Sequence, residues 1–322
     1  MKKVDLLLVN TVRSAIDAAL TQALSNPKLN EPTLVAKLVQ QIPLQINNAL
    51  PLPPGLSIRS GGVFVHQTPK VKWTTPAMQK HRSVEIGDLL LLRKEIVKGK
   101  PEQTRALLLQ AKKIDSNWAG QPDNPDQHTL YHEWPPFEYV RSTPALNGEK
   151  RHVISKDIYM GAKYLLLSNS PYPKGCCCHT QYIGQSGCIC KTAMPTSPEL
   201  SFYHCFADEL TQFILGLAGL KYIKAGKRIG WDKVIEDLTT ITAEILTVYT
   251  KTNKAKGLRG QGDYKLCFLS GDTGALSFLD SNIVSRIPTL DENDGDSINN
   301  FERGNEGEDG GISIIEFTVS YD

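Results

Sequence analysis

Two apolar runs with polar residues at one end constrain most strongly what this chain can fold into. Residues 83–93 (SVEIGDLLLLR) and 105–112 (RALLLQAK) are bounded by polar turns and are too short for stable helices. Apolar runs of this length are typical of central strands that are buried on both faces of a sheet. The turn at residues 98–101 (KGKP) indicates an antiparallel pair. The sequence therefore predicts a sheet with both runs near its centre.

Two amphipathic helices are predicted before this sheet. Residues 4–25 repeat apolar side chains at helical spacing. A second helix begins with Asn30 as N-cap and Pro32 in the first turn, and we expect it to end near Gln41. Short strands are then expected at residues 56–66 and 71–73.

The remaining segments are predicted to complete or extend the sheet. Residues 115–152 carry several prolines and are expected to be irregular. Residues 291–311 hold eight Asp or Glu against one Arg and are expected to form a mobile acidic loop. Later strands are expected at 160–168, 264–270 and 312–319, and helices at 206–223 and 231–249.

Composition and length exclude several classes of protein. The chain has 322 residues, a formal net charge of +2 and 40% hydrophobic residues, which excludes a strongly basic DNA-coating protein and extensive disorder. No run approaches the roughly 18 apolar residues of a membrane span, and no leader pattern follows the N-terminus. A soluble, cytoplasmic protein with no membrane partner is expected. Three regions are predicted: a core at 1–115, an irregular insertion with a cysteine-rich loop at 116–205, and helices and late strands at 206–322.

The polar residues within the apolar runs carry the strongest chemical signal. Asp88 begins one run, and Gln110 and Lys112 end the other on one face of a strand because they are two residues apart. Buried charges need a partner, a hydrogen bond or a metal ion. Carboxylate and amide oxygens suit Mg²⁺, and a lysine can orient water or stabilise phosphate charge. The pattern favours phosphodiester hydrolysis.

Asp88 followed by Gln110-Ala111-Lys112 resembles the PD-(D/E)xK nuclease superfamily, in the variant with Gln at the second acidic position. The resemblance covers about residues 28–115 and implies an α/β, restriction-endonuclease-like core: a helix, a central mixed sheet and flanking helices, here with a large C-terminal elaboration. It also implies that Glu31, on the helix before the strands, joins Asp88 and Gln110 as a ligand of Mg²⁺ or Mn²⁺. The chain departs from the pattern at Gly87, where the superfamily often has proline, and the Gln leaves one negative charge fewer for the metal.

A purely structural interpretation of the same residues stays open. Asp88 would then lie in a turn of an edge strand, Gln110 would be solvated, and Lys112 would extend its ammonium into water. Glu85 is three residues from Asp88, on the opposite face of a regular strand, and we expect it to be solvated.

A cysteine-rich segment offers a second, weaker site. Thiolates and an imidazole in a glycine-rich loop can form a tetrahedral zinc site, although the spacing of these cysteines departs from the usual two-residue gap. Unliganded or redox-active thiols are the alternative. The candidate zinc ligands are Cys176, Cys178, His179, Cys188 and Cys190.

The resemblance implies a Mg²⁺-dependent or Mn²⁺-dependent endodeoxyribonuclease that binds DNA, and by analogy a role in restriction or antiphage defence. Cutting two strands with one site per chain favours a homo-oligomer, and a defence role would add a partner protein. The alternative is a non-catalytic module that binds a partner protein and uses the cysteine loop as structural zinc. No phosphate-loop or dinucleotide fingerprint is present, so neither ATP nor NAD is expected.

Overall fold

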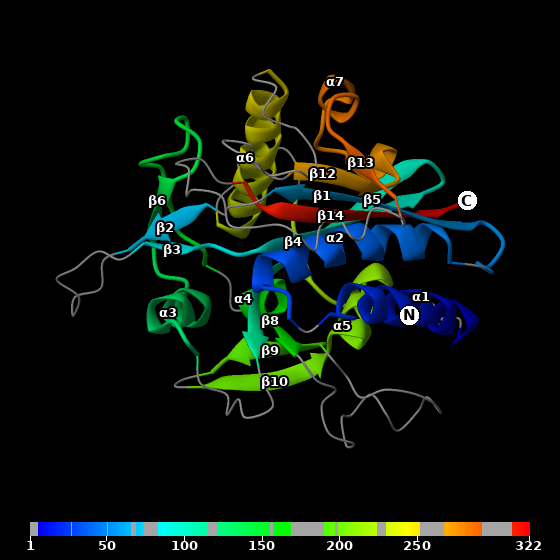
Figure 1. Ribbon diagram of the computed structural model, residues 1–322, viewed down its shortest axis with the longest axis horizontal. Coiled ribbons are helices and arrows are strands. Elements are labelled where there is room, and N and C mark those ends of the chain that lie inside the picture. Colours follow the sequence, from blue (N-terminus) through cyan, green and yellow to red (C-terminus); the bar gives the residue numbers. More distant parts are fainter. Residues whose placement is uncertain are drawn as a thin grey trace.

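A mixed α/β architecture with helices on both faces of one large sheet is seen in the computed structural model (Figure 1). The structure describes residues 6–26, 28–49, 51–65, 69–73, 83–114, 122–154, 157–168, 190–196, 199–223, 230–251, 267–291 and 311–322. The helices are α1 (Leu6–Ala23), α2 (Glu31–Asn47), α3 (Pro125–Glu133), α4 (Ile158–Gly161), α5 (Phe206–Ile214), α6 (Trp231–Lys251) and α7 (Ser281–Val284), with the short 3-10 helix η2 (Thr273–Ala275). The predicted α/β class, with a central mixed sheet and flanking helices, is confirmed at this level.

The large sheet mixes parallel and antiparallel pairs, in the order β10-β9-β8-β5-β4-β14-β1-β12-β13, with β11 paired to β5. The predicted antiparallel pair is β4 with β5, joined at Lys98 and Gly99, which both have positive φ. β8 is parallel to β5, and β14 is parallel to β4. The strands are β1 (Leu56–Val65), β4 (Leu89–Val97), β5 (Lys100–Ile114), β8 (Ala162–Ser168), β9 (Cys190–Pro195), β10 (Leu200–Cys205), β11 (Leu220–Lys221), β12 (Cys267–Gly271), β13 (Thr289–Leu290) and β14 (Ser313–Tyr321).

The sheet separates two apolar cores. Leu107 and Leu109 of β5 pack with α1, α2 and α5 on one face, whereas Leu108 packs with α3 and α6 on the other. All three leucines are completely buried. Burial on both faces explains why the two runs read as continuous apolar segments rather than as alternating ones.

The two N-terminal helices are confirmed. The Asn30 side chain caps α2 by accepting a hydrogen bond from the backbone N of Thr33 at 2.9 Å. α2 continues past the predicted end at Gln41, because Ile46 still packs into the core and is 1% exposed. Gly62 of β1 lets the helix approach the sheet, since a Cβ there would lie 2.5 Å from the carbonyl oxygen of Val39.

The run at residues 83–93 divides into two strands that belong to different sheets. Its first part forms β3, and its second part begins β4 at Leu89. β3 belongs to a four-stranded sheet of order β3-β2-β6-β7. The members of this smaller sheet are β2 (Lys70–Lys72), β3 (Ser83–Glu85), β6 (Phe137–Arg141) and β7 (Lys150–Arg151).

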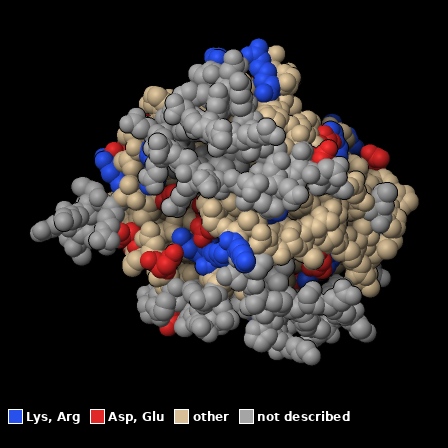
Figure 2. Space-filling model, in the orientation of Figure 1, with Lys and Arg blue, Asp and Glu red and all other residues tan. Residues whose placement is uncertain are grey.

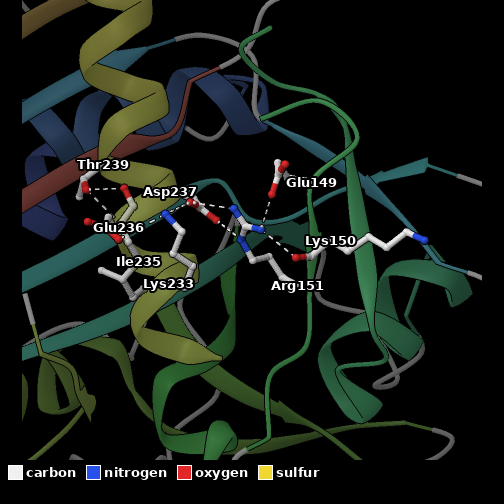
Figure 3. Close-up of polar contacts among 8 residues, drawn as sticks. All are labelled: Glu149, Lys150, Arg151, Lys233, Ile235, Glu236, Asp237 and Thr239. Carbon is white, nitrogen blue, oxygen red and sulfur yellow. Dashed lines mark hydrogen bonds and ion pairs between the residues drawn. The ribbon is translucent and has the colours of Figure 1, made fainter. Parts of the chain in front are cut away.

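The prediction that residues 115–152 are irregular is wrong for part of that segment. It contains α3, which is capped by the Asn124 side chain with proline in its first turn, and also β6 and β7. A buried ion pair connects this segment to α6: Arg151 Nε donates to Asp237 Oδ2 at 2.6 Å (Figure 3). Lys233, one turn earlier on α6, lies 3.0 Å from Asp237 Oδ1.

Later predictions are mixed. The expected helix at 206–223 ends at Ile214, because Gly216 and Gly219 adopt positive φ and turn the chain toward β11. The strand expected at 160–168 begins with the short helix α4. The expected helix at 231–249 is α6, and the strands expected at 56–66, 71–73, 264–270 and 312–319 are found within the described residues as β1, β2, β12 and β14. Most of the expected acidic loop lies outside the described residues. No helix among the described residues has the length and apolar character needed to cross a membrane.

Candidate active site

The candidate site lies where β4 begins and β5 extends beyond it. Leu89 of β4 pairs with Leu109, and β5 continues to Ile114. Asp88 therefore stands immediately before β4, with its backbone N donating to the carbonyl oxygen of Leu109 at 2.9 Å. Its Oδ2 accepts the backbone N–H of Ala111 at 2.7 Å and a hydrogen bond from Nε2 of Gln110.

Glu31 occupies the equivalent position one step further along the edge of β5. It is the first residue of α2, and its Oε2 accepts the backbone N–H of Lys113 at 2.9 Å. The two carboxylates thus accept hydrogen bonds from the backbone N–H groups of Ala111 and Lys113. These groups lie beyond the start of β4 and have no carbonyl partner on that strand. The edge of β5 holds Asp88 and Glu31 beside Gln110.

Lys112 supplies the positive charge of the site. Its side chain is 18% exposed, and its Nζ lies 3.5 Å from Oδ2 of Asp123, just before α3. Burial opposes the charge on Lys112, yet the surrounding carboxylates, led by Glu31 and Asp123, raise the pKa of this lysine above its usual range. Lys112 is therefore protonated at neutral pH.

The acidic side chains outnumber the single lysine. Burial raises the pKa of Asp88 well above its usual range, and the charges of Glu85 and Glu31 raise it further. Burial also raises the pKa of Glu31, and the charge of Lys112 partly offsets this rise.

The face in Figure 2 shows acidic and basic side chains directly beside one another near its centre, in the region of α2, α4 and β8. Additional positive charge at this site would stabilise the ionised carboxylates.

The prediction that Glu85 is merely solvated does not describe its surroundings. It is half-buried, and its charge acts on Asp88, Glu31 and Lys112. Glu85 ends β3 and Asp88 precedes β4, so the alternation of a regular strand does not separate the two side chains onto opposite faces. Glu85 belongs to the acidic part of the site.

The residues present fit a hard divalent cation with bound water. Oε1 of Gln110 is buried and has no hydrogen-bond partner among the described residues. The described hydrogen bonds of Asp88 and Glu31 fall on one oxygen of each carboxylate. No group of three His, Cys, Asp or Glu side chains within the described ranges is arranged to hold a metal ion. Mg²⁺ needs only one or two carboxylates, because it keeps several waters.

Gly87 has a packing reason for departing from the proline of the resemblance. A Cβ at this position would lie 2.7 Å from Cδ1 of Leu108 and 2.9 Å from the hydroxyl of Tyr131. That hydroxyl donates to the carbonyl oxygen of Ile86 at 2.9 Å. Any side chain at residue 87 would therefore require Leu108 and Tyr131 to shift.

The sequence pattern does not single out three residues that lie around the site. Asp123 and Tyr131 belong to the segment expected to be irregular, and Tyr164 lies within a predicted strand to which no chemistry was assigned. The Asn124-Pro125 helix start was the available signal for α3, since it is a common N-cap and first-turn pair. The tyrosines gave no local signal, because Tyr164 reaches the site through the pairing of β5 with β8 and Tyr131 through the packing of α3 beside Ile86.

Most of the predicted zinc ligands, Cys176, Cys178, His179 and Cys188, lie outside the described residues. Cys190 begins β9, is 1% exposed and packs in the core with α5. Burial raises the pKa of its thiol well above the usual range, with a smaller contribution from Cys205. Since the thiolate is the form that binds zinc, this environment disfavours Cys190 as a ligand. The zinc site stays a prediction.

Comparison of the chain with protein-family models, with curated proteins and with solved structures finds no match.

Proposed function

We propose that this protein is a metal-dependent nuclease that hydrolyses phosphodiester bonds of DNA. The observation that supports it most directly is the gathering of Asp88, Gln110 and Glu31 at the free edge of β5, with Lys112 on the same strand. Carboxylate and amide oxygens can bind a divalent cation, a protonated lysine can stabilise charge on a phosphate, and raised carboxyl pKa values often mark functional sites.

In this proposal Asp88, Gln110 and Glu31 hold Mg²⁺ or Mn²⁺. The bound ion supplies Lewis acidity and a more acidic water molecule. Lys112 is a donor rather than a base, because its pKa is raised and its ammonium stays protonated. Its Nζ stabilises the charge that develops on the phosphate oxygens and orients the attacking water.

The proposal includes a restriction-endonuclease-like core. The order α2, β1, β4, β5 is similar to the order of a helix and three strands in the PD-(D/E)xK superfamily, which supports this part of the proposal. Glu31 lies on α2, Asp88 directly before β4, and Gln110 and Lys112 on β5. An added feature is β14, which lies between β1 and β4 and pairs with both. Cytoplasmic action in restriction or antiphage defence extends the proposal by analogy alone.

The direct test is cleavage of plasmid and linear DNA by purified protein with Mg²⁺ or Mn²⁺. We expect Asp88→Ala and Lys112→Ala to reduce the rate by at least ~100-fold, the usual scale for losing a transition-state stabiliser. Lys94→Ala, a lysine of β4 outside the site, is the matched control. Single-stranded DNA and RNA of the same sequence define the substrate.

Two results would contradict the proposal. One is a wild-type protein that is inert with both metal ions on every nucleic acid tested. The other is cleavage that persists in Asp88→Ala and Lys112→Ala, which would indicate a contaminating nuclease or a different site. Circular dichroism of each variant shows whether a loss of cleavage reflects unfolding.

A further inference from the structure

Two buried polar atoms on neighbouring strands of the candidate site have no hydrogen-bond partner within the described part of the chain. One is Oε1 of Gln110 on β5, and the other is the hydroxyl of Tyr164 on β8. Gln110 is 0% exposed and Tyr164 is 1% exposed. A buried polar group without a partner costs free energy because it has lost its hydrogen bonds to water. Two such groups on adjacent strands can satisfy each other.

Gln110 and Tyr164 are direct register partners in the parallel pair of β5 and β8. Register partners on adjacent strands point to the same face, and such strands are about 4.8 Å apart. Burial, followed by the charges of Asp123 and Asp88, raises the pKa of Tyr164. The charges of the site therefore act on the phenol of Tyr164, which keeps its proton at neutral pH. A tyrosine hydroxyl can both donate and accept a hydrogen bond.

Tyr131 provides an internal comparison. Its ring packs against Tyr164 with centroids 5.2 Å apart, and it is also buried. Its hydroxyl, however, already donates to the carbonyl oxygen of Ile86. Of these two phenols beside the site, only Tyr164 has a hydroxyl that lacks a hydrogen-bond partner among the described residues. Its register partner Gln110 has an Oε1 that also lacks one.

We propose that Tyr164 is a positioning residue that holds the amide of Gln110 in two orientations. In the first orientation Nε2 faces Asp88, as it does in the structure, and the hydroxyl, which makes no hydrogen bond to the described residues in the structure, moves to donate to Oε1. Turning the amide over brings Oε1 beside Asp88, where the two oxygens can share a cation, and Nε2 then donates to the same hydroxyl. The hydroxyl serves both states because it is donor and acceptor. The catalytic meaning of this contact rests on the proposed function.

The contact is tested first without metal, from the side-chain amide resonances of ¹⁵N-labelled protein. Gln110→Ala identifies the Gln110 resonance by its disappearance. We expect Tyr164→Phe to shift this resonance and Tyr131→Phe to move it much less, because only the first removes the hydroxyl beside Oε1. An unmoved Gln110 resonance in folded Tyr164→Phe overturns the proposal.

The role in cation binding is tested by titration with Mn²⁺ alone. Partners behind a metal ligand typically contribute 10- to 100-fold in affinity, so Tyr164→Phe is expected to weaken Mn²⁺ binding about tenfold. Tyr131→Phe should bind like wild type. In a Gln110→Ala background, Tyr164→Phe should have no further effect, since the hydroxyl acts through the amide.

The failures of the two proposals are distinguishable. Equal Mn²⁺ affinity of wild type and Tyr164→Phe overturns the role of Tyr164 and leaves the nuclease proposal standing. A wild-type protein that binds no Mn²⁺ overturns the cation site, and with it both the proposed function and the catalytic meaning of the Tyr164 contact. In that case a shifted Gln110 resonance would still report the hydrogen bond itself.

Discussion

Asp88 combines the structural and the chemical demands on this site in one residue. Its carboxylate accepts the Ala111 N–H and the Gln110 amide, which fixes the edge of β5. The same carboxylate is half-buried near Glu85 and Glu31, and desolvation together with their charges raises its pKa well above the usual range. Its ionised form is therefore disfavoured in the folded protein. A bound cation would reverse that balance.

Asp88→Asn is expected to stabilise the metal-free protein at neutral pH. A carboxyl whose pKa is raised on folding binds more protons folded than unfolded, so its contribution to stability falls as pH rises above its unfolded pKa. Asn has no ionisable carboxyl, so the substitution removes this pH-dependent loss of stability, while its Oδ1 can still accept a hydrogen bond. The melting temperature at pH 7.5 should rise on the order of 2 °C, with the difference vanishing below about pH 4. A variant that melts lower than wild type at pH 7.5 would show that the hydrogen bonds dominate.

Glu85→Gln tests whether Glu85 acts electrically on Asp88. Removing its negative charge eases ionisation of Asp88, so the pKa of Asp88 falls. If ionised Asp88 is needed for cleavage, the acid limb of the pH–rate profile should move to lower pH. Glu149→Gln, which changes an exposed glutamate away from the site, should leave the profile in place. An unchanged profile in Glu85→Gln would remove Glu85 from the electrostatics of Asp88.

At the level of elements, a buried carboxylate joins α6 to the smaller sheet. Asp237 is 1% exposed and forms ion pairs with Arg151 and Lys233 (Figure 3). Arg151 has a second carboxylate partner, Glu149, which is 56% exposed and 3.1 Å away. The chain thus offers one arginine with a buried and an exposed partner.

Asp237→Ala is expected to lower the free energy of unfolding by about 2–4 kcal/mol, because it leaves two cations near the protein interior without their carboxylate. Glu149→Ala should cost less than ~1 kcal/mol, as exposed ion pairs do. Denaturant unfolding of both variants measures the difference. Equal effects would mean that the Asp237 contacts do not brace α6 against β7.

The elements that could be predicted from the sequence are those with local causes. α1 and α2 follow from apolar spacing and from the Asn30 cap, and β4 and β5 from their apolar runs and the turn between them. The candidate site residues Asp88, Gln110 and Lys112 were singled out because polar groups in buried strands are costly, and the structure brings them close to one another. The surroundings of Glu85 were predicted wrongly because the strand is interrupted between Glu85 and Leu89. Tyr164 was missed because its position depends on the pairing of β5 with β8. Such long-range pairings leave no periodic signal.

At the scale of the whole molecule, the C-terminal strand β14 lies within the large sheet between two strands from the N-terminal part of the chain. It pairs antiparallel with β1 and parallel with β4, so the last described strand lies beside the strand that follows Asp88. Its residues contribute to both cores: Ile314 to one face and Phe317 to the other. The site is assembled from residues 31–164, yet its sheet depends on residues 313–321. We expect the large sheet to unfold as one cooperative unit.

Phe317→Ala tests this unity, because Phe317 is completely buried and packs edge-on against Phe213 of α5. Truncating a buried phenylalanine typically costs ~3–5 kcal/mol through lost burial and the cavity left behind. Thr318→Ala, the next residue and only half-buried, should cost less than ~1 kcal/mol. Hydrogen exchange should show β1, β4, β5 and β14 losing protection together in Phe317→Ala. Protection that is lost in β1 and β14 while β4 and β5 keep theirs would mean that the strands carrying the candidate site are stable without the C-terminal strand.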